Sequence, residues 1–198
     1  MVPTRQAAPE SAPRMTPGAR SVLDAASTLF AERGLNAVGV DTIAAEAGVT
    51  KKTIYDRFGS KAQLVALYLT ERDERFRAWV DARIAPEEGI ERPLAIFDAL
   101  ESWTRTHSPR GCAFVHAHAE LLTEPEHPAH AVIEAEKEWV RARFAGLVGE
   151  LGCTDPEGLA VQLLALHEGA TVLHATTATP EVARRCRDAA EVLIRSAL

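Results

Sequence analysis

GVDTIAAEAGVTKKTIYDRFGSK, residues 39–61, has the spacing of two short helices joined by a tight turn. Gly48 lies where the first helix must stop, and a glycine accepts the left-handed backbone that such a turn needs. Apolar residues recur at helical spacing before the glycine and resume after it, at Val40, Ile43, Ala44, Ala47, Val49, Ile54 and Phe58. The pattern predicts a helix-turn-helix.

The polar side chains left on the outer face of this motif favour DNA binding. In a helix-turn-helix the second helix enters the major groove with its N-terminal residues against the base edges. Lys51 and Lys52 can donate to guanine, while Tyr55 and Lys61 offer a hydroxyl and a charge to phosphates. The residues predicted to bind DNA are Asp41, Thr42, Thr50, Lys51, Lys52, Thr53, Tyr55, Arg57 and Lys61.

The run AAEAGVTKKTIYDRFGSKAQL, residues 44–64, resembles the TetR family of one-component bacterial transcriptional regulators. The family pattern has a Tyr and a Phe three residues apart, a Gly/Ser break, then a Lys and a Leu. This chain supplies Tyr55, Phe58, Gly59, Ser60, Lys61 and Leu64. The resemblance extends to the preceding helix, residues 22–34, and in outline to the rest. It implies an all-α fold, with an N-terminal three-helix DNA-binding domain joined through a long fourth helix to a C-terminal helical ligand-binding and dimerisation domain.

Three positions of the motif raise questions of their own. Gly39 stands where the family usually has Ser or Thr, so one hydroxyl contact to phosphate is absent. Arg57 stands where the family usually has His or Tyr, and it could reach either backbone or base. Asp41 could accept from cytosine N4 or could merely orient Lys51, and we favour the second role.

Composition limits the class of protein. The chain has 198 residues, 46% of them hydrophobic, which is enough for a sizeable core. It contains no apolar run near the ~20 residues of a membrane span, and its N-terminus lacks the apolar segment of a secretion signal. We therefore expect a cytoplasmic protein. Cys112, Cys153 and Cys186 are far apart and form no CxxC pair, which argues against a disulfide framework or a structural zinc site.

The net charge of −6 is divided unevenly along the chain. Residues 1–61 hold eight Lys and Arg against six Asp and Glu, whereas the remainder holds fourteen against twenty-two. Only the predicted DNA-binding part is therefore basic. Because phosphate affinity depends on local charge, the acidic remainder is compatible with DNA binding.

Helix signals divide the chain into three predicted parts: a flexible arm at 1–15, a helix-turn-helix domain at 16–61 and an effector-binding and dimerisation domain at 62–198. Thr16 and Pro17 are a helix start, and Gly34 ends that helix. Ser60 with Gln63 is a capping box that opens a long helix to about Ile84. Further helices are predicted at 93–107, 112–123, 129–151, 156–176 and 180–197, the last opened by Thr179 and Pro180.

The last two predicted helices carry apolar stripes with small residues. By resemblance to the family, these helices meet a second copy as a four-helix bundle, giving a homodimer that reads a near-palindromic operator. The alternative is that both stripes face an intramolecular core. The stripes comprise Leu159, Leu163, Leu166, Gly169, Ala170 and Leu173, then Val182, Cys186, Ala189, Ala190 and Leu193.

The resemblance also implies a small-molecule effector, which we expect to be apolar or aromatic, and a repressor that releases DNA when the effector binds. Helical spacing cannot separate a pocket wall from ordinary packing. The candidate effector-binding residues are Trp79, Trp103, Phe114, His118, Leu121, Trp139, Phe144, Leu163 and His167.

The histidines leave two alternatives open. His116 with Glu120, or His127 with His130, could place two metal ligands on one helix face, which would suit a metal-responsive regulator of the same fold. A His/Glu pair could also serve a small helical enzyme, but the chain has no GxSxG elbow and no phosphate loop. We expect no enzyme activity, no bound metal and no cofactor.

Overall fold

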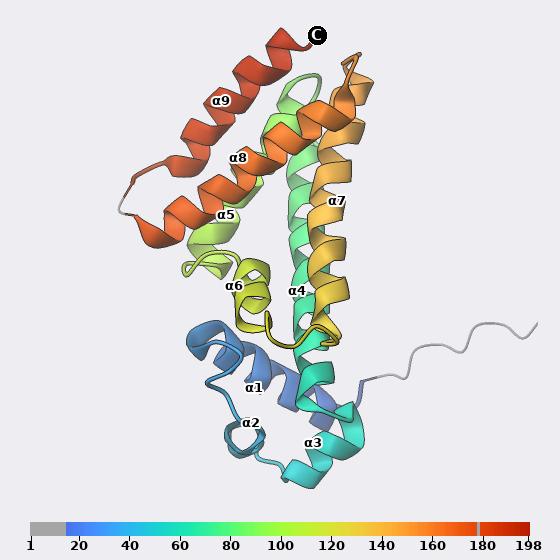
Figure 1. Cartoon of the computed structure of the whole chain (residues 1–198), viewed down its shortest axis with the longest axis vertical. Coiled ribbons are helices and arrows are strands. Elements are labelled where there is room, and N and C mark those ends of the chain that lie inside the picture. The colour runs from blue at the N-terminus through green and yellow to red at the C-terminus, as the bar shows by residue number, and fades with distance from the viewer. Residues whose placement is uncertain (1–14, 178) are drawn as a thin grey trace, which may run out of the picture.

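The computed structural model describes residues 15–177 and 179–198, so the predicted arm, residues 1–15, lies outside it except for Met15. Within this part the chain forms nine helices and no strand, which confirms the all-α prediction (Figure 1). The helices are α1 Pro17–Arg33, α2 Val40–Glu46, α3 Lys51–Phe58, α4 Lys61–Ile84, α5 Glu91–His107, α6 Ala113–Glu120, α7 Ala129–Glu150, α8 Pro156–Thr176 and α9 Val182–Ser196.

The helix starts that carry clear sequence signals lie where predicted. The Thr16 hydroxyl accepts a hydrogen bond from the Ala19 amide at 3.3 Å, and Pro17 occupies the first turn of α1. The Ser60 hydroxyl accepts from the Gln63 amide at 3.1 Å and opens α4. Both side chains satisfy amides that have no partner inside the helix.

Three of the predicted helix limits are wrong by two residues or more, and one of them is the start of α5, which lies at Glu91 and not at Pro93. α9 begins at Val182, and the Thr179 hydroxyl and amide are both bonded to the Thr177 hydroxyl, so Thr179 does not cap it. α6 ends at Glu120, because the Leu121 amide bonds to the carbonyls of both Ala117 and His118, in a tightened last turn.

Two hydrophobic clusters lie at opposite ends of α4. The first joins α1, α2, α3 and the start of α4 to α6 and the start of α7, and includes Phe30, Ile43, Ile54, Leu64, Phe114 and Leu121. The second joins the rest of α4 to α5, α7, α8 and α9, and includes Phe76, Phe97, Val140, Phe144, Leu163 and Ile194. α6 therefore packs against the helix-turn-helix end of the molecule (Figure 1). The division of the chain at residue 61 stays a prediction.

The apolar stripes of α8 and α9 are mostly internal. Leu159, Leu163, Ala170, Val182 and Ala190 are buried within the chain, so their prediction as a surface that meets a second copy is wrong. Two members of the predicted stripes, Leu173 and Ala189, are exposed, and Val161, Ala165, Val172 and Val192 are exposed on the same helices. No helix in the described ranges is long and apolar enough to cross a membrane.

Candidate functional site

The helix-turn-helix forms the end of the molecule opposite the C-terminus (Figure 1). Ile43 of α2 and Ile54 of α3 are completely buried and fix the two helices on the first cluster. Gly48 between them has φ +66°, the left-handed conformation predicted for the turn. The Thr50 hydroxyl accepts from the Thr53 amide at 3.2 Å and caps α3.

The residues predicted to bind DNA lie on the outer face of this unit. Thr42, Thr53 and Lys61 are half-buried, and the others are exposed. Lys51 Nζ lies 2.6 Å from Asp41 Oδ1, so the structure brings these two side chains together, and the orienting role of Asp41 stays a prediction. Lys52 Nζ lies 2.7 Å from Asp56 Oδ2. The DNA contacts of these residues stay predictions.

Lys61 has a structural partner inside the molecule. Its ammonium donates to the Leu35 carbonyl at 2.6 Å, in the connection between α1 and α2. Burial lowers its pKa, against the opposing effect of Glu120 and Glu124. A lysine ammonium has three donors, so Lys61 can hold this connection and still offer a proton to a phosphate.

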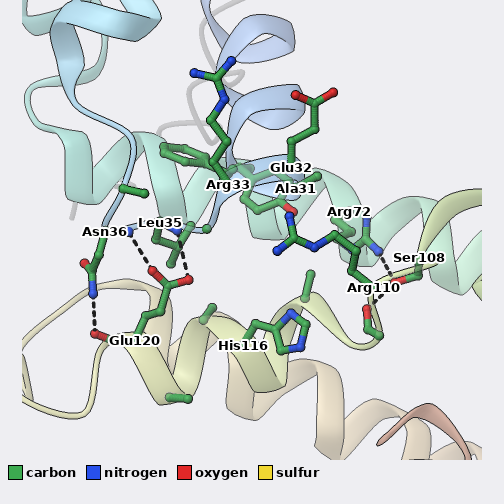
Figure 2. A pocket seen from close by; sticks show the side chains of 18 of the residues that line it. Ala31, Glu32, Arg33, Leu35, Asn36, Arg72, Ser108, Arg110, His116 and Glu120 are labelled. Carbon is green, nitrogen blue, oxygen red and sulfur yellow. Dashed lines mark hydrogen bonds between the residues drawn. The ribbon is translucent and has the colours of Figure 1, made fainter. Parts of the chain in front are cut away.

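Glu120, at the end of α6, holds the same connection from the other side. Its carboxylate accepts from the Leu35 amide at 3.0 Å and from the Asn36 amide at 2.6 Å. The Asn36 side chain donates to the Glu120 carbonyl at 3.1 Å. Figure 2 shows Glu120 pointing from α6 to these residues across one end of a surface cleft of about 650 Å³. Charge-assisted bonds of this kind couple the position of α6 to the α1–α2 connection.

A second, interior cavity of about 30 Å³ lies among α4, α5, α6, α7 and α8. It adjoins the surface cleft, because Arg72, Ser108 and Ala113 line both. Its remaining walls are Phe76, Leu100, Trp103, Thr104, Cys112, Phe114, Glu136, Lys137, His167, Glu168 and Thr171. Arg72 donates to the Ser108 hydroxyl at 2.6 Å and to the His107 carbonyl at 3.2 Å, on the side that faces the cleft (Figure 2).

Another part of the cavity wall is a cluster of ionisable groups around Lys137. Its ammonium donates to Glu168 Oε1 at 2.8 Å and lies 3.0 Å from Glu136 Oε2 and 3.4 Å from Cys112 Sγ. Burial alone would lower the pKa of Lys137, but the negative charges of the Cys112 thiolate and of the two carboxylates raise it. Burial raises the pKa of the Cys112 thiol, so at neutral pH the carboxylates are the charges that hold Lys137.

The two carboxylates of this cluster are held differently. Burial raises the pKa of Glu168, but the hydrogen bond from His167 and the charge of Lys137 outweigh it and keep this pKa at about 2. Burial raises the pKa of Glu136, and there it prevails over the charge of Lys137. Glu136 Oε2 is buried and paired with Lys137 Nζ at 3.0 Å, whereas His167 Nε2 is buried without a hydrogen-bond partner. A buried polar atom of this kind needs a partner from outside the described residues, such as an ordered water or a ligand.

Of the nine residues predicted for the effector site, Trp103, Phe114 and His167 line this cavity. Trp79 packs on Trp103 with ring centroids 5.8 Å apart. The other five are placed elsewhere. Phe144 and Leu163 belong to the second cluster and Leu121 to the first, Trp139 packs under Arg77, and His118 is exposed beside His130.

Sequence reasoning missed the charged members of the cavity. Their signal was a polar residue in phase with the apolar face of a helix: Arg72 falls between Leu69 and Phe76, and Glu136 between Ile133 and Val140. A buried charge at such a position needs a partner, and that requirement was available from the sequence alone.

The histidine pairs considered as metal ligands have other contacts. Glu120 is bound to the α1–α2 connection, and His116 lies beside the surface cleft (Figure 2). His127 Nδ1 accepts from the Ala129 amide at 3.1 Å, and His130 Nε2 lies 2.9 Å from the Glu124 carbonyl. Among residues 15–177 and 179–198, no group of three or more His, Cys, Asp or Glu is placed to hold a metal ion.

Comparison with known proteins identifies the class of the chain. The family model of bacterial regulatory proteins of the TetR family matches residues 22–68. A crystal structure of a TetR-family transcriptional regulator from Streptomyces coelicolor superposes with a TM-score of 0.83 at 28% identity, covering 91% of this chain and 95% of that one.

Two curated relatives point the same way. The transcriptional regulator AcuR of Cereibacter sphaeroides is 29% identical over 177 residues, which cover 84% of this chain and 80% of AcuR. The transcriptional activator FasR of Mycolicibacterium smegmatis is 30% identical over 123 residues, which cover 58% of this chain and 52% of FasR. The match thus spans about half the length of FasR.

Proposed function

Because the chain belongs to the TetR family of bacterial regulatory proteins, we propose that it acts as a homodimeric repressor that a small-molecule effector releases from its operator. It is a DNA-binding transcriptional regulator. The observation that carries the proposal is the helix-turn-helix at one end of the molecule, with Thr50, Lys51, Lys52 and Tyr55 exposed on α3 and its cap. We place the protein in the cytoplasm, where its operator would lie.

In this proposal α3 enters the major groove and its first turn reads the bases. Lys51 and Lys52 donate to guanine O6 and N7, and the methyl groups of Thr50 and Thr53 face thymine. Tyr55 and Lys61 contact phosphates. The 2.6 Å ion pair with Asp41 holds the Lys51 ammonium in place before DNA binds. On binding, a base edge replaces the water around the ammonium.

The proposed dimer forms through the exposed face of α8 and α9. Val161 is 56% exposed, Val172 46% and Val192 67%, which leaves a stripe of apolar side chains in water. Burying this stripe against a second copy gives a two-fold axis, and a two-fold dimer reads half-sites whose centres lie about 34 Å apart. The face is at the end of the molecule away from α3, so small rotations about it move the two α3 helices by larger distances (Figure 1).

The interior cavity is the proposed effector site, and α6 is the proposed link to DNA. The cavity of about 30 Å³ holds about one water molecule, whereas ligand pockets span about 300 to 1,000 Å³. An effector must therefore displace a wall. Phe114 of α6 is one such wall, and Glu120 at the other end of α6 is bound to the α1–α2 connection. Displacing α6 would then move the helix-turn-helix.

Activation is the second candidate for the sign of regulation. The observation that favours it is the similarity to FasR, which is named as an activator. Repression and activation require the same DNA contacts and the same dimer. They differ in where the operator lies relative to the promoter. Transcription of the adjacent gene from a reporter, with and without this protein, separates them.

DNA binding is tested by fluorescence anisotropy with duplexes that flank the protein's own gene, at several salt concentrations and with scrambled duplex as competitor. We expect binding that resists the competitor, with two protomers per site. Tyr55→Phe and Lys61→Ala should weaken binding to all sequences, and Lys61→Ala should reduce the salt slope by about 0.9. Lys51→Ala and Lys52→Ala should alter sequence preference.

The matched control is Arg83→Ala, an exposed cation near the far end of α4. It should leave the affinity and the salt slope unchanged. Weak binding that scrambled duplex removes would contradict the operator proposal, and an unchanged salt slope in Lys61→Ala would contradict its phosphate contact.

A further inference from the structure

We propose that the surface cleft between α1 and α6 binds a small organic anion, whose carboxylate or phosphate group is held by Arg72, Tyr68 and Arg110. The inference goes beyond the proposed function, because it assigns a second ligand site, outside the interior cavity. It is tested on the protein without DNA, so its failure and that of the proposed function are separate results.

The cleft has the size of a ligand site. Its volume of about 650 Å³ falls within the range of about 300 to 1,000 Å³ found for small-molecule pockets, whereas the interior cavity has about 30 Å³. Much of its wall is apolar and comes from Phe30, Ala31, Pro109, Ala113 and Ala117. The cleft can therefore take the apolar part of an organic molecule in the conformation that the structure shows.

Arg72 is the first donor of the site. The residue is only 7% exposed and lines the cleft. Its Nη2 donates to the Ser108 hydroxyl and the His107 carbonyl, whereas Nε and Nη1 have no hydrogen-bond partner among the described residues. Arg72 also forms no ion pair with a carboxylate in the described part of the chain. Three N–H donors of its guanidinium thus stay available to a ligand.

Tyr68 is the second donor. It lies one helical turn before Arg72 on α4, so both side chains are on the same face of that helix. The residue is 3% exposed and lines the cleft, and its hydroxyl has no hydrogen-bond partner within residues 15–177 and 179–198. Burial raises the pKa of Tyr68, against the opposing charge of Arg72, so the hydroxyl keeps its proton at neutral pH.

These donors are open to a ligand. The buried side-chain atoms that lack a hydrogen-bond partner include neither the Tyr68 hydroxyl nor Nε and Nη1 of Arg72. Because these three atoms have no protein partner, they are accessible to solvent although their residues are almost fully buried. Buried residues that keep unpaired donors at the surface of a cleft are arranged to bind acceptor atoms.

The charges at this end of the cleft favour an anion. Figure 2 shows Arg72 and Arg110 at one end of the cleft and Glu120 at the other. Arg110 is exposed and forms no ion pair among the described residues, whereas the Glu120 carboxylate is bound to two amides of the α1–α2 connection. Guanidinium groups bind carboxylate and phosphate through pairs of parallel hydrogen bonds.

The surroundings of the two arginines agree with this choice. Burial and the charges of Arg72 and Arg75 lower the pKa of His107, which also lines the cleft. The edge of the cleft on α1 carries one exposed charge of each sign, at Glu32 and Arg33. The excess of positive charge therefore lies at the end where the free donors are.

The test uses one aromatic skeleton with four polar ends. The full-length protein is titrated by calorimetry with 2-naphthoate, 2-naphthyl phosphate, 2-naphthamide and 2-naphthylmethylamine, in a buffer without phosphate or carboxylate. We expect at least one of the two anions to bind at least about tenfold more tightly than the amide and the amine. The order of the two anions shows which oxyanion the site takes. An amide or amine that binds as tightly as both anions, or no binding of either anion, would overturn the proposal.

Variants of the donors test their roles. Tyr68→Phe removes a hydroxyl that has no protein partner, so it should keep the thermal midpoint and reduce anion affinity about fivefold or more. Arg72→Lys keeps the charge but loses the planar fork, and Arg110→Gln removes a charge; each should reduce affinity about tenfold or more. If Arg72→Lys does not fold, the other two decide. Anion binding that is unchanged in folded Tyr68→Phe and Arg110→Gln would refute the site.

Two further variants locate the anion. Ala31→Trp changes an exposed residue of α1 that lines the cleft and not the interior cavity, and the larger side chain should block anion binding. The matched control for the arginines is Arg105→Gln, an exposed arginine of α5 that does not line the cleft, and it should bind anions like the wild type. Full anion affinity in Ala31→Trp, or an equal loss in Arg105→Gln, would place the anion outside the cleft.

Discussion

At the scale of single residues, the most informative feature is the group of charges inside the C-terminal part. Charged side chains are rarely buried unless they are paired. Here Arg72 and Glu136 are almost fully buried, and Lys137, Glu168 and His167 meet beside them. A filled hydrophobic core would not need these groups, so their presence points to a site and not to packing alone.

Glu168 gives the first prediction, a pH dependence of stability. Its pKa of about 2 in the folded protein lies below the ordinary value near 4.3. The ionised carboxylate therefore stabilises the fold above about pH 4.3, and this stabilisation is lost as the pH falls toward 2. In urea unfolding, Glu168→Gln should lose about 2 to 3 kcal/mol at pH 7, and its deficit should shrink between pH 4.3 and 2.

Glu134→Gln is the control for this series, because Glu134 is an exposed carboxylate on the neighbouring helix α7. Its stability should follow that of the wild type at every pH. A deficit of Glu168→Gln that stayed constant from pH 7 to pH 2 would show that the carboxylate's charge does not stabilise the fold.

Lys61 gives the second prediction, which separates a structural lysine from a surface lysine. Lys61→Met removes the hydrogen bond to the Leu35 carbonyl, and we expect a loss of about 1 to 2 kcal/mol in the free energy of unfolding. Lys52→Met removes only an exposed ion pair with Asp56 and should change stability by less than about 0.5 kcal/mol. Equal losses in the two variants, measured by urea unfolding, would contradict the structural role of Lys61.

At the scale of elements, α6 is the part that connects the two ends of the molecule. Phe114 near its start faces the interior cavity, Leu121 just after its end packs in the first cluster, and Glu120 binds the α1–α2 connection. A helix moves as a rigid unit, so a displacement of one end of this short helix also displaces the other end. α6 thus contacts both the interior cavity and the connection between α1 and α2.

The third prediction tests this connection by hydrogen exchange. The Leu35 and Asn36 amides donate to the Glu120 carboxylate, so Glu120→Ala should make both amides exchange at least about tenfold faster. Glu124→Ala, four residues further along and exposed, is the control and should leave both amides protected. Unchanged exchange in Glu120→Ala would mean that another contact holds the connection.

At the scale of the whole molecule, the two ends of the chain have different surfaces. The helix-turn-helix end presents polar and basic side chains, whereas α8 and α9 present the apolar stripe of Val161, Val172 and Val192. Large apolar side chains left exposed on neighbouring helices make this face the candidate interface. The separation of these surfaces is what a two-fold DNA reader requires, with the contact between copies at one end and both α3 helices at the other.

The fourth prediction concerns the dimer. Val172→Asp places a charge on the exposed stripe, and we expect a monomer in sedimentation equilibrium together with a loss of operator binding of at least about a hundredfold. Leu122→Asp changes a residue that is 66% exposed just after α6, and it should remain a dimer. A dimer in both variants would show that the interface does not lie on α8 and α9.

The sequence by itself determined the helices and the helix-turn-helix. The reason is that caps, turns and apolar spacing act over a few residues: Thr16, Gly48 and Ser60 each satisfy local backbone geometry that is legible in the chain. The same signals failed at Thr179, because its hydroxyl is hydrogen-bonded to the Thr177 hydroxyl and does not cap α9.

Only the tertiary structure decided the cavity, the inner and outer faces of α8 and α9, and the contacts of Lys61 and Glu120. These depend on side chains brought together from distant parts of the chain: Glu120 lies 85 positions from Leu35, and Lys137 lies 31 from Glu168. Periodicity identifies the apolar face of a helix but not which element covers it, because that choice is made by packing among all the helices at once.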